Sequence, residues 1–522
     1  MPGKSPASGA EYSLTGSGRF PLQVEPIHAV STESFHQPEA GRTYKAPGLV
    51  SLPEGFLRIL NDLKSAGYPA LLVGGSVRDA LLGVAAKDLD LEVYGIGFAE
   101  LANFLGSRGR VDLVGQAFGV VKFRSSAGME CDFSVPRRDS KIGVSHRDFY
   151  SSCDPSMTIK EAASRRDFTI NSMAFDPLRG ELYDYFGGRD DLRAKVLRAT
   201  SAAFKEDPLR VLRGAQFACR FDLEVDPDTA AVCRSIAGEF DTLPKERICE
   251  EFMKWATKST RPGRLIGYLD ATGWLGNFPL LASLQAVPQD AEWHPEGDVA
   301  VHTMHVVDAA ARIAMREGLD DFERCVLLMG ALTHDLAKAG TTELRDVRGA
   351  IRWTSYGHDK ASGPKARMFL ESVGIKEEII ERVVPLVENH LAHHDFRSED
   401  TPARTARRLA TRLAPANIRE LALLIEADAS GRPPLVEGLP EAAGRMLRLA
   451  TELRIEVAPE KPLIFGRHVL PYFKGVSGPR IGRVVQAAYE AQLDGAFTDM
   501  GGALEWLSGY MSEFSPGDGE TG

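Results

Sequence analysis

Paired glycines and paired aspartates between Leu71 and Tyr94 have the spacing of a phosphate-binding metal site. Gly74 and Gly75 follow an apolar run that is typical of a buried strand, and a glycine turn lets the backbone approach a phosphate closely. Asp88 and Asp90 are two residues apart, so on a strand both carboxylates point to one face. Carboxylates hold divalent metals, and the metals offset phosphate charge. The stretch therefore predicts metal-assisted nucleotide chemistry.

The elements around this site follow from hydrophobic periodicity. Ser76 is a suitable N-cap for a short helix that ends at Gly83. A later strand over residues 130–134 places Glu130 and Asp132 on one face, which makes either a candidate third acid near the metals. The competing interpretation of these two acids is a half-solvated edge strand.

A polar cluster farther along, residues 164–174, contains the residue types that bind phosphate and ribose. Arg166 is a candidate phosphate donor, and Asp167 and Asn171 are candidates for holding sugar hydroxyls. A capped helix start explains the same residues without a ligand. The polar and basic segment before the cluster, residues 136–150, is predicted to be a mobile loop.

Asp207 and Arg210 form a candidate base-reading pair. They are three residues apart on one face of a helix whose first position suits Pro208. Cytosine and adenine both present an exocyclic amine beside a ring-nitrogen acceptor, which a carboxylate and a guanidinium match. Uracil and guanine put a carbonyl in place of the amine. The pair predicts selection of C and A without a template; the alternative is that Asp207 only caps the helix.

Histidine is concentrated in one part of the chain. Eight of the 12 histidines lie in residues 294–394. Imidazole nitrogens combined with aspartate oxygens suit a divalent metal that keeps open positions for water. A single helical histidine is more often a packed core residue, so the prediction depends on an ordered series; His393 and His394 are expected at the surface. The series is His302, His334, Asp335 and Asp428.

Composition limits the class of protein. The net charge is −10, which argues against a surface that coats nucleic acid generally. Residues 122–220 nevertheless carry 18 Lys and Arg against 14 Asp and Glu, a net of +4 that suits a confined phosphate-rich ligand. No run approaches the roughly 20 apolar residues of a membrane span. The six cysteines form no CxxC pair, which is typical of reduced thiols, so we expect a cytoplasmic protein with no membrane partner.

The motifs, in this order, resemble the class II tRNA nucleotidyltransferase / poly(A) polymerase family, specifically the bacterial CCA-adding type with an HD domain. GGSVRDALLG and KDLDLEV resemble its nucleotidyltransferase signature. SRRDFTINSMAFDP resembles its ribose-binding motif, and EDPLRVLRGAQFACRF its base-selecting motif. The resemblance extends from about residue 60 to the C-terminus. One departure is Gln216, where the base-selecting helix of the family usually carries arginine.

The resemblance implies an α+β fold: a nucleotidyltransferase-type mixed β-sheet head followed by a mostly α-helical body that includes an HD domain. It implies addition of C and A from CTP and ATP to the 3′ end of tRNA, with no DNA partner. The expected divisions are a disordered extension over 1–50, the head over 51–200, a helical neck with the base-selecting motif over 201–290, the HD region over 291–432 and a helical C-terminal region over 433–522.

The resemblance also implies roles for single residues. At the head, Gly74, Gly75 and Arg78 would contact the phosphates. Asp88 and Asp90 would bind two Mg²⁺ ions, one activating the 3′-hydroxyl of the RNA and one easing departure of pyrophosphate. Triphosphate, ribose and base would be held by Arg166, Asp167, Asn171, Asp207, Arg210 and Arg213.

At the HD site, the ordered series would bind a second divalent metal. His358 and His390 are candidate ligands of a further ion there. The region is a candidate phosphohydrolase for phosphomonoesters or 2′,3′-cyclic phosphates at RNA ends.

Three other functions stay open at this point. A CC-, A- or poly(A)-adding enzyme would use the same motifs. A phosphohydrolase with a vestigial head is opposed by the intact pair Asp88 and Asp90 and the intact pair Asp207 and Arg210. A non-catalytic RNA-binding protein would not need two metal sites.

Overall fold

The computed structural model describes residues 41–84, 89–113, 119–125, 128, 130–141 and 149–513. The chain divides into two compact units. The first runs to Arg210 and includes Asp226–Thr229, and the second contains the remainder. Within the described ranges, no helix combines the length and the apolar character needed to cross a lipid bilayer.

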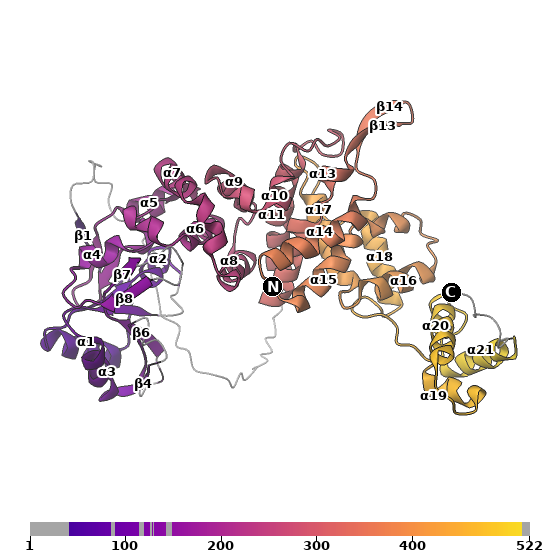
Figure 1. The fold of residues 1–522 in the computed structure, drawn as a ribbon, viewed down its shortest axis with the longest axis horizontal. Coiled ribbons are helices and arrows are strands. Elements are labelled where there is room, and N and C mark those ends of the chain that lie inside the picture. Colours follow the sequence, from indigo (N-terminus) through magenta and orange to yellow (C-terminus); the bar gives the residue numbers. More distant parts are fainter. Residues whose placement is uncertain are drawn as a thin grey trace, which may run out of the picture. The chain divides into compact units, whose positions relative to one another are not determined.

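The first unit is built on one mixed sheet (Figure 1). Its strand order is β1-β10-β9-β2-β3-β6-β5-β4. The pair β3–β6 is parallel, and the other pairs of this sheet are antiparallel. The strands are β1 (Arg42–Lys45), β2 (Ala70–Val73), β3 (Asp90–Val93), β4 (Gly109–Asp112), β5 (Val120–Ser125), β6 (Glu130–Ser134), β9 (Ala174–Asp176) and β10 (Glu181–Asp184).

The two faces of this sheet differ. Helices α1 (Glu54–Ser65) and α3 (Phe98–Gly106) bury Leu60 and Leu105 against one face, in the main core of the unit. The opposite face has a smaller apolar cluster that includes Leu71. Glu92 is the cross-strand partner of Leu71, so its side chain lies on the same, less covered face. Side chains alternate along a strand, so Asp90, two residues earlier, lies on that face as well. The acids of β3 belong to that face.

Short helices complete the first unit. The turn at Gly74 has φ +70°, a conformation that glycine adopts without strain. Helix α2 starts at Gly75, so the predicted N-cap at Ser76 is wrong; the Ser76 hydroxyl instead donates to the carbonyl of Val73 at 2.8 Å. The helices are α2 (Gly75–Leu81), α4 (Ile159–Ser164), the 3₁₀ turn η2 (Thr169–Asn171) and α5 (Gly188–Ala194).

Two further sequence predictions fail in this unit. The extension predicted to be disordered over residues 1–50 is ordered from Arg42, because β1 pairs with β10 and Leu49 is buried in the core; residues 1–40 lie outside the described ranges. The segment predicted as a loop over 136–150 contains strand β7 (Arg137–Lys141), which pairs with β8 (Phe149–Cys153). In both segments the strand forms because its backbone pairs with another strand, and amino-acid composition does not reveal such pairing.

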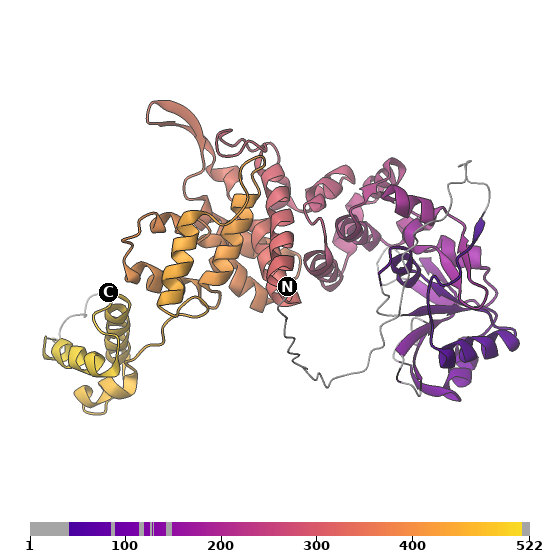
Figure 2. The same ribbon diagram turned by 180° about the vertical axis from the view of Figure 1, so that it is seen from behind.

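The second unit is almost entirely helical. Helices α11, α12, α15 and α17 pack against one another and form its centre (Figures 1 and 2). An antiparallel ribbon, β13 (Glu343–Val347) with β14 (Ala350–Thr354), projects from these helices. The helices are α7 (Pro227–Ser235), α8 (Lys245–Lys258), α9 (Arg264–Ala271), α10 (Pro279–Ala282), α11 (Val299–Glu317), α12 (Asp321–Thr333), α13 (Lys338–Thr341), α14 (His358–Ser372), α15 (Glu377–Glu388), α16 (Ala403–Leu413), α17 (Ile418–Ser430), α18 (Glu441–Glu452), α19 (Gly466–Val469), α20 (Pro479–Leu493) and α21 (Met500–Glu513).

The ends of the central helices are fixed by side-chain caps. Asp298 accepts a hydrogen bond from the backbone N–H of Val301 at the start of α11. Asp320 and Asn417 form capping boxes at α12 and α17. These caps define where α11, α12 and α17 begin, and those helices carry most of the histidine series. The predicted fold class, a mixed-sheet head with a helical body, is confirmed.

Candidate functional site

The glycine turn and the arginine cluster of the head lie against each other. Arg166 approaches Gly74 so closely that a β-carbon there would lie 2.8 Å from its Nη1 atom. Arg166 also lies 3.7 Å from Glu92 through its Nη2 atom. The structure therefore brings a guanidinium, which binds phosphate readily, to the turn that sequence reasoning assigned to phosphate.

A buried hydrogen-bonded chain connects two motifs that are about ninety residues apart. Nη1 of Arg78 donates to Oδ1 of Asn171 at 2.5 Å, and Nδ2 of Asn171 donates to Oδ1 of Asp167 at 2.9 Å. Arg78 also binds Asp79 through Nε and Nη2. Arg78, Asn171 and Asp167 are each less than a tenth exposed. The arrangement holds the guanidinium below the turn in one orientation.

Substituting Asn171 by alanine should break this chain. Removing a buried hydrogen-bonding side chain costs about 1–3 kcal/mol of unfolding free energy, and the free orientation of Arg78 should raise the dissociation constants of CTP and ATP. Denaturant unfolding and nucleotide titration measure the two effects. Ser172→Ala is the matched control, because Ser172 is also buried and, among the described residues, its hydroxyl donates to the Thr169 carbonyl. Equal loss of nucleotide affinity in both variants would contradict the prediction.

The acids of the head lie on adjacent parallel strands. Asp90 begins β3 and is in register with Asp132 of β6. Partners in register share a face, so these two carboxylates and Glu92 belong to the less covered face of the sheet. Oxygen ligands of this kind fit Mg²⁺. Asp88 lies outside the described residues. Of the two candidate third acids, Asp132 is partly buried beside Asp90, whereas Glu130 is exposed and paired with Arg124 at 3.5 Å.

The proposed base-reading pair begins helix α6 (Leu209–Phe221). Oδ1 of Asp207 accepts from the backbone N–H of Leu209 at 3.1 Å, so the capping interpretation of this residue has a structural basis. Arg210 donates to the carbonyls of Ala203 and Arg165 at 2.7 and 3.0 Å. Both side chains are partly exposed, and these contacts fix the guanidinium without covering it.

Two further residues of the base-selecting motif belong to the second unit. Arg213 lies over the ring of Phe217, 5.4 Å from its centroid. Gln216 is buried, and its Nε2 atom has no hydrogen-bond partner among the residues that the structure describes. Gln216 therefore takes a core position on α6 in this chain.

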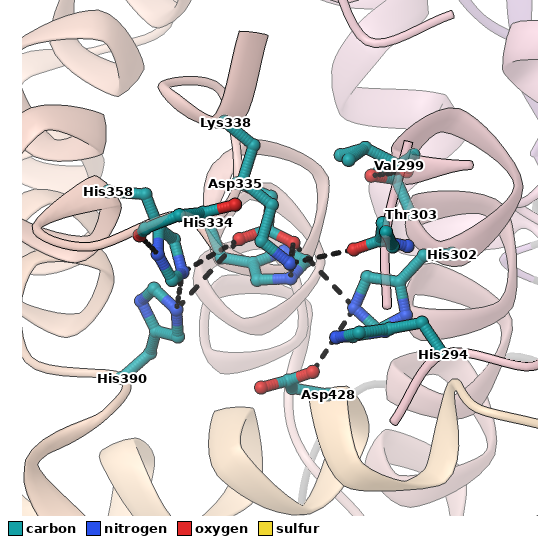
Figure 3. Close-up of polar contacts among 12 residues, drawn as sticks. His294, Val299, His302, Thr303, His334, Asp335, Lys338, His358, His390 and Asp428 are labelled. Atoms are coloured by element: carbon teal, nitrogen blue, oxygen red, sulfur yellow. Dashed lines mark hydrogen bonds and ion pairs between the residues drawn. The ribbon is translucent and has the colours of Figure 1, made fainter. Parts of the chain in front are cut away.

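The histidine series converges in the second unit, and Figure 3 shows the cluster. Its members come from the start of α11, the end of α12, the start of α14, the end of α15 and the end of α17. Asp335 lies at the centre. Its Oδ2 atom is 3.1 Å from Nε2 of His334 and 3.7 Å from Nε2 of His302. Its Oδ1 atom is 3.2 Å from Nε2 of His358 and 4.0 Å from Nε2 of His390.

The remaining predicted member, Asp428, lies next to the first of these two groups. Its Oδ1 atom is 3.1 Å from Nε2 of His302. His302, His334 and Asp428 can each direct one ligand atom to a common point, and Asp335, His358 and His390 form a second such set. The carboxylate of Asp335 thus faces two adjacent clusters of potential metal ligands.

The tautomers of three histidines follow from their backbone contacts. Nδ1 of His334, His358 and His390 lies 2.8, 2.6 and 2.7 Å from the carbonyl oxygens of Ala331, Ser355 and Val387. A carbonyl only accepts, so each Nδ1 carries the proton and each Nε2 offers a lone pair to the centre. Metal-binding histidines commonly have this second hydrogen bond.

Several atoms at the centre fit a bound cation. Both ring nitrogens of His302, Nε2 of His334 and both oxygens of Asp335 are buried and make no hydrogen bond in the described part of the chain, although charged groups lie at ion-pair distance from them. Nε2 of His358 and Nε2 of His390 lie 3.3 Å apart, both as acceptors. Two lone pairs repel at this distance unless a cation or a proton lies between them. The nitrogen and oxygen donors suit a transition metal.

Burial and neighbouring charges set the ionisation of the cluster. Burial, with His358 and His334 nearby, lowers the pKa of His390 to about 3, so this imidazole is neutral at pH 7. Burial opposes ionisation of Asp335, but His334 and Lys338 hold the pKa of its carboxyl well below the usual range. Neutral imidazoles and ionised carboxylates are the forms that bind metals.

Sequence reasoning missed three residues of this site. Lys338 lies 2.8 Å from Oδ2 of Asp335, and His294 and Glu296 adjoin His302. Lys338 had a usable signal, since it stands three residues after Asp335 on one helical turn. The expectation that His393 lies at the surface is wrong: it is 8% exposed, and its Nδ1 atom lies 3.3 Å from the carbonyl of His390.

Known proteins match both units. Residues 70–198 match the poly A polymerase head domain, and residues 299–428 match the HD domain. The multifunctional CCA protein of Xanthomonas campestris pv. campestris (strain B100) is 37% identical over 371 residues, which is 69% of this chain and 85% of that protein. The multifunctional CCA protein of Paracidovorax citrulli is 34% identical over 428 residues, 80% of this chain and 95% of that protein.

Solved structures show the same fold at lower identity. The Bacillus stearothermophilus CCA-adding enzyme in complex with CTP aligns with a TM-score of 0.59 at 19% identity, covering 88% of this chain and 99% of that one. The Thermotoga maritima CCA-adding enzyme complexed with tRNA aligns with a TM-score of 0.54 at 20% identity, covering 91% and 100%. The resemblance found in the motifs is confirmed. By the extent and identity of these matches, the chain belongs to the family of multifunctional CCA proteins.

Proposed function

We propose that this nucleotidyltransferase adds C and A to the 3′ end of tRNA, using CTP and ATP and no nucleic-acid template. The observation that carries the proposal is the buried chain from Arg78 through Asn171 to Asp167. It joins the glycine turn to the ribose motif, so that one nucleotide could contact both. The 37% identical multifunctional CCA protein of Xanthomonas campestris supports the same reaction.

Each candidate site residue of the head has a proposed role. Gly74, Gly75 and Arg78 hold the phosphates, with Arg166 beside the turn. Asp167 and Asn171 hold the ribose. Divalent metal, which we propose to be Mg²⁺ on Asp88 and Asp90, would supply charge compensation for the triphosphate and activation of the terminal hydroxyl of the RNA. The carboxylates of Asp90 and Asp132, side by side on one face, are suited to hold it.

Base choice is proposed to depend on Asp207 and Arg210, with Arg213 in support. The Arg210 guanidinium is anchored by the Ala203 and Arg165 carbonyls, so its direction is set before a base arrives. An acceptor and a donor held in fixed directions fit the amine and ring nitrogen of C or A. They leave U and G with an unpaired carbonyl–carboxylate contact.

An extension assay tests this proposal directly. Three tRNA substrates are used, one ending before CCA, one ending after CC and one complete. We expect incorporation from both CTP and ATP on the first, from ATP alone on the second and from neither on the third, because the pair reads only C and A. UTP and GTP should not be used on any of them. Use of a single nucleotide on the first substrate would show a CC-, A- or poly(A)-adding enzyme instead.

A second activity is proposed for the HD domain. The two adjacent ligand sets, one of His302, His334 and Asp428 and one of Asp335, His358 and His390, support a metal-dependent phosphohydrolase that acts on phosphomonoesters or 2′,3′-cyclic phosphates at RNA ends. Its metal would be held by His302, His334, Asp335 and Asp428, with a further ion at His358 and His390. Both activities would serve tRNA processing, for which we propose a cytoplasmic location; all six cysteines are free thiols, which suits a reducing compartment.

A further inference from the structure

The loop before α11 places a buried carboxylate behind the HD cluster. The side chain of Glu296 is 1% exposed, and its Oε1 atom lies 2.8 Å from Nδ1 of His302, an ion-pair contact that lacks hydrogen-bond geometry in this structure. The same oxygen lies 2.9 Å from Nδ1 of His294. Oε2 of Glu296 is buried and has no hydrogen-bond partner among the described residues. Burying an ionised carboxylate costs free energy, so a buried Glu296 beside two imidazoles is expected to have a function that offsets this cost.

His302 needs an acceptor that the other histidines of the cluster find in the backbone. His334 and His390 follow the ends of α12 and α15, where the last carbonyls of a helix have no helical partner. His302 lies in the first turn of α11, where the carbonyls are already used; that of Val299, three residues earlier, accepts from the hydroxyl of Thr303. The acceptor for His302 must therefore come from outside the helix.

Ring geometry separates two roles for Glu296. The two nitrogens of an imidazole point to different sides of the ring. Nε2 of His302 faces Asp428 at 3.1 Å, so the carboxylate at Nδ1 lies on the far side of the ring from that metal position. At that metal position Glu296 is thus placed to orient a ligand and not to be one, although with His294 and Nδ1 of His302 it forms a separate group of potential ligands. His294 packs edge-to-face on His302, with ring centroids 4.8 Å apart, and fills the space beside it (Figure 3).

We propose that Glu296 is a positioning residue for metal binding by the HD domain, acting through His302. It keeps the proton of His302 on Nδ1 and the lone pair of Nε2 toward Asp428 and Asp335. This inference rests on the proposed HD metal site. Outer carboxylates of this kind typically contribute on the order of 10- to 100-fold to metal affinity.

Metal affinity tests the proposal without any enzymatic readout. Full-length protein carrying Asp90→Ala, which weakens the head metal site, is titrated with Mn²⁺, and free Mn²⁺ is measured by electron paramagnetic resonance. We expect Glu296→Ala to weaken binding by on the order of 10- to 100-fold. Glu296→Gln should weaken it less, because an amide oxygen in the same place can accept from Nδ1 of His302 without carrying the charge. Glu292→Ala, an exposed acid of the same loop that pairs with Arg352, should leave binding unchanged.

A double-mutant cycle separates positioning from general structural support. In a His302→Ala background, Glu296→Ala should cause no further loss of Mn²⁺ affinity, since its only route to the metal is gone. If the losses of Mn²⁺ affinity in the two single variants add up in the double variant, the role of Glu296 is overturned and the proposed metal site stands. If His302→Ala by itself leaves Mn²⁺ binding intact, the proposed metal site and the inference both fail. Thermal unfolding of each variant shows whether the fold persists. If the Glu296→Ala protein is unfolded, the Mn²⁺ affinity of the Glu296→Gln protein decides the question.

Discussion

Replacing Asp90 with alanine is expected to lower the rate of nucleotide addition by on the order of 10³-fold, equivalent to roughly 4 kcal/mol of lost transition-state stabilisation. Asp90 stands at the start of β3, in register with Asp132, on the face of the sheet where Arg166 approaches the glycine turn. Removing one of a few carboxylates there removes a ligand for the cation that offsets the triphosphate charge. Single-turnover incorporation of labelled CMP into tRNA lacking CCA measures the effect.

The control for this variant is another acid of the same sheet. Asp112 ends β4, at the edge of the sheet and away from β3 in the strand order. Asp112→Ala should add CMP at the normal rate. Asp90→Ala should also keep any phosphohydrolase activity, because that activity is proposed for the other unit. Normal CMP addition by Asp90→Ala, or loss of both activities, would contradict the assignment of two separate sites.

The strand and glycine turn of the head site could be predicted because they depend on residues that are adjacent in the sequence. The apolar run before Gly74 forms β2, and the glycines form the turn, as hydrophobic pattern and backbone freedom require. The position of Asp132 beside Asp90 is different. β3 and β6 are parallel and separated by β4 and β5 along the chain, so their register depends on the whole sheet. The sequence left Glu130 and Asp132 as equal candidates for that reason.

The HD cluster shows the same division. Residue types and order predicted which side chains converge there, since few soluble helices carry His and Asp at so many buried positions. Glu296 had no such signal. It lies in a Pro- and Gly-containing loop without periodicity, and its importance comes from a contact with His302 that depends on where α11 begins. His393 was misjudged in the same way, because a helix end packs it beside His390.

Composition misled where backbone pairing decides the structure. Residues 41–50 resemble the Gly-, Ser- and Pro-rich segment before them, yet β1 adds to the edge of the sheet by pairing with β10. Leu49 and Val50 then enter the core. A short apolar pair after a polar strand is too weak a pattern to override a disorder-like composition. Sheet edges are thus the part of this fold that its sequence describes least.

His334→Ala is expected to lower the rate of hydrolysis by the HD domain by on the order of 10²-fold or more. It should leave the rate of CCA addition unchanged. The imidazole is 1% exposed, its Nδ1 is fixed by the Ala331 carbonyl, and its Nε2 lies 3.1 Å from Asp335. Alanine removes a proposed nitrogen ligand and leaves the Asp335 carboxylate in place. Hydrolysis of a 2′,3′-cyclic nucleotide and metal content by mass spectrometry measure the loss.

A second histidine supplies the comparison for that result. His305 lies one turn after His302 on α11 and is exposed, so His305→Ala removes the same chemistry without touching the cluster. It should hydrolyse the cyclic nucleotide normally and retain its metal. Because the head and the HD cluster belong to different units, the two variants His334→Ala and Asp90→Ala should have opposite phenotypes. If His334→Ala keeps its metal and its hydrolytic rate, the ions are bound elsewhere, and the convergence of these histidines on Asp335 is structural.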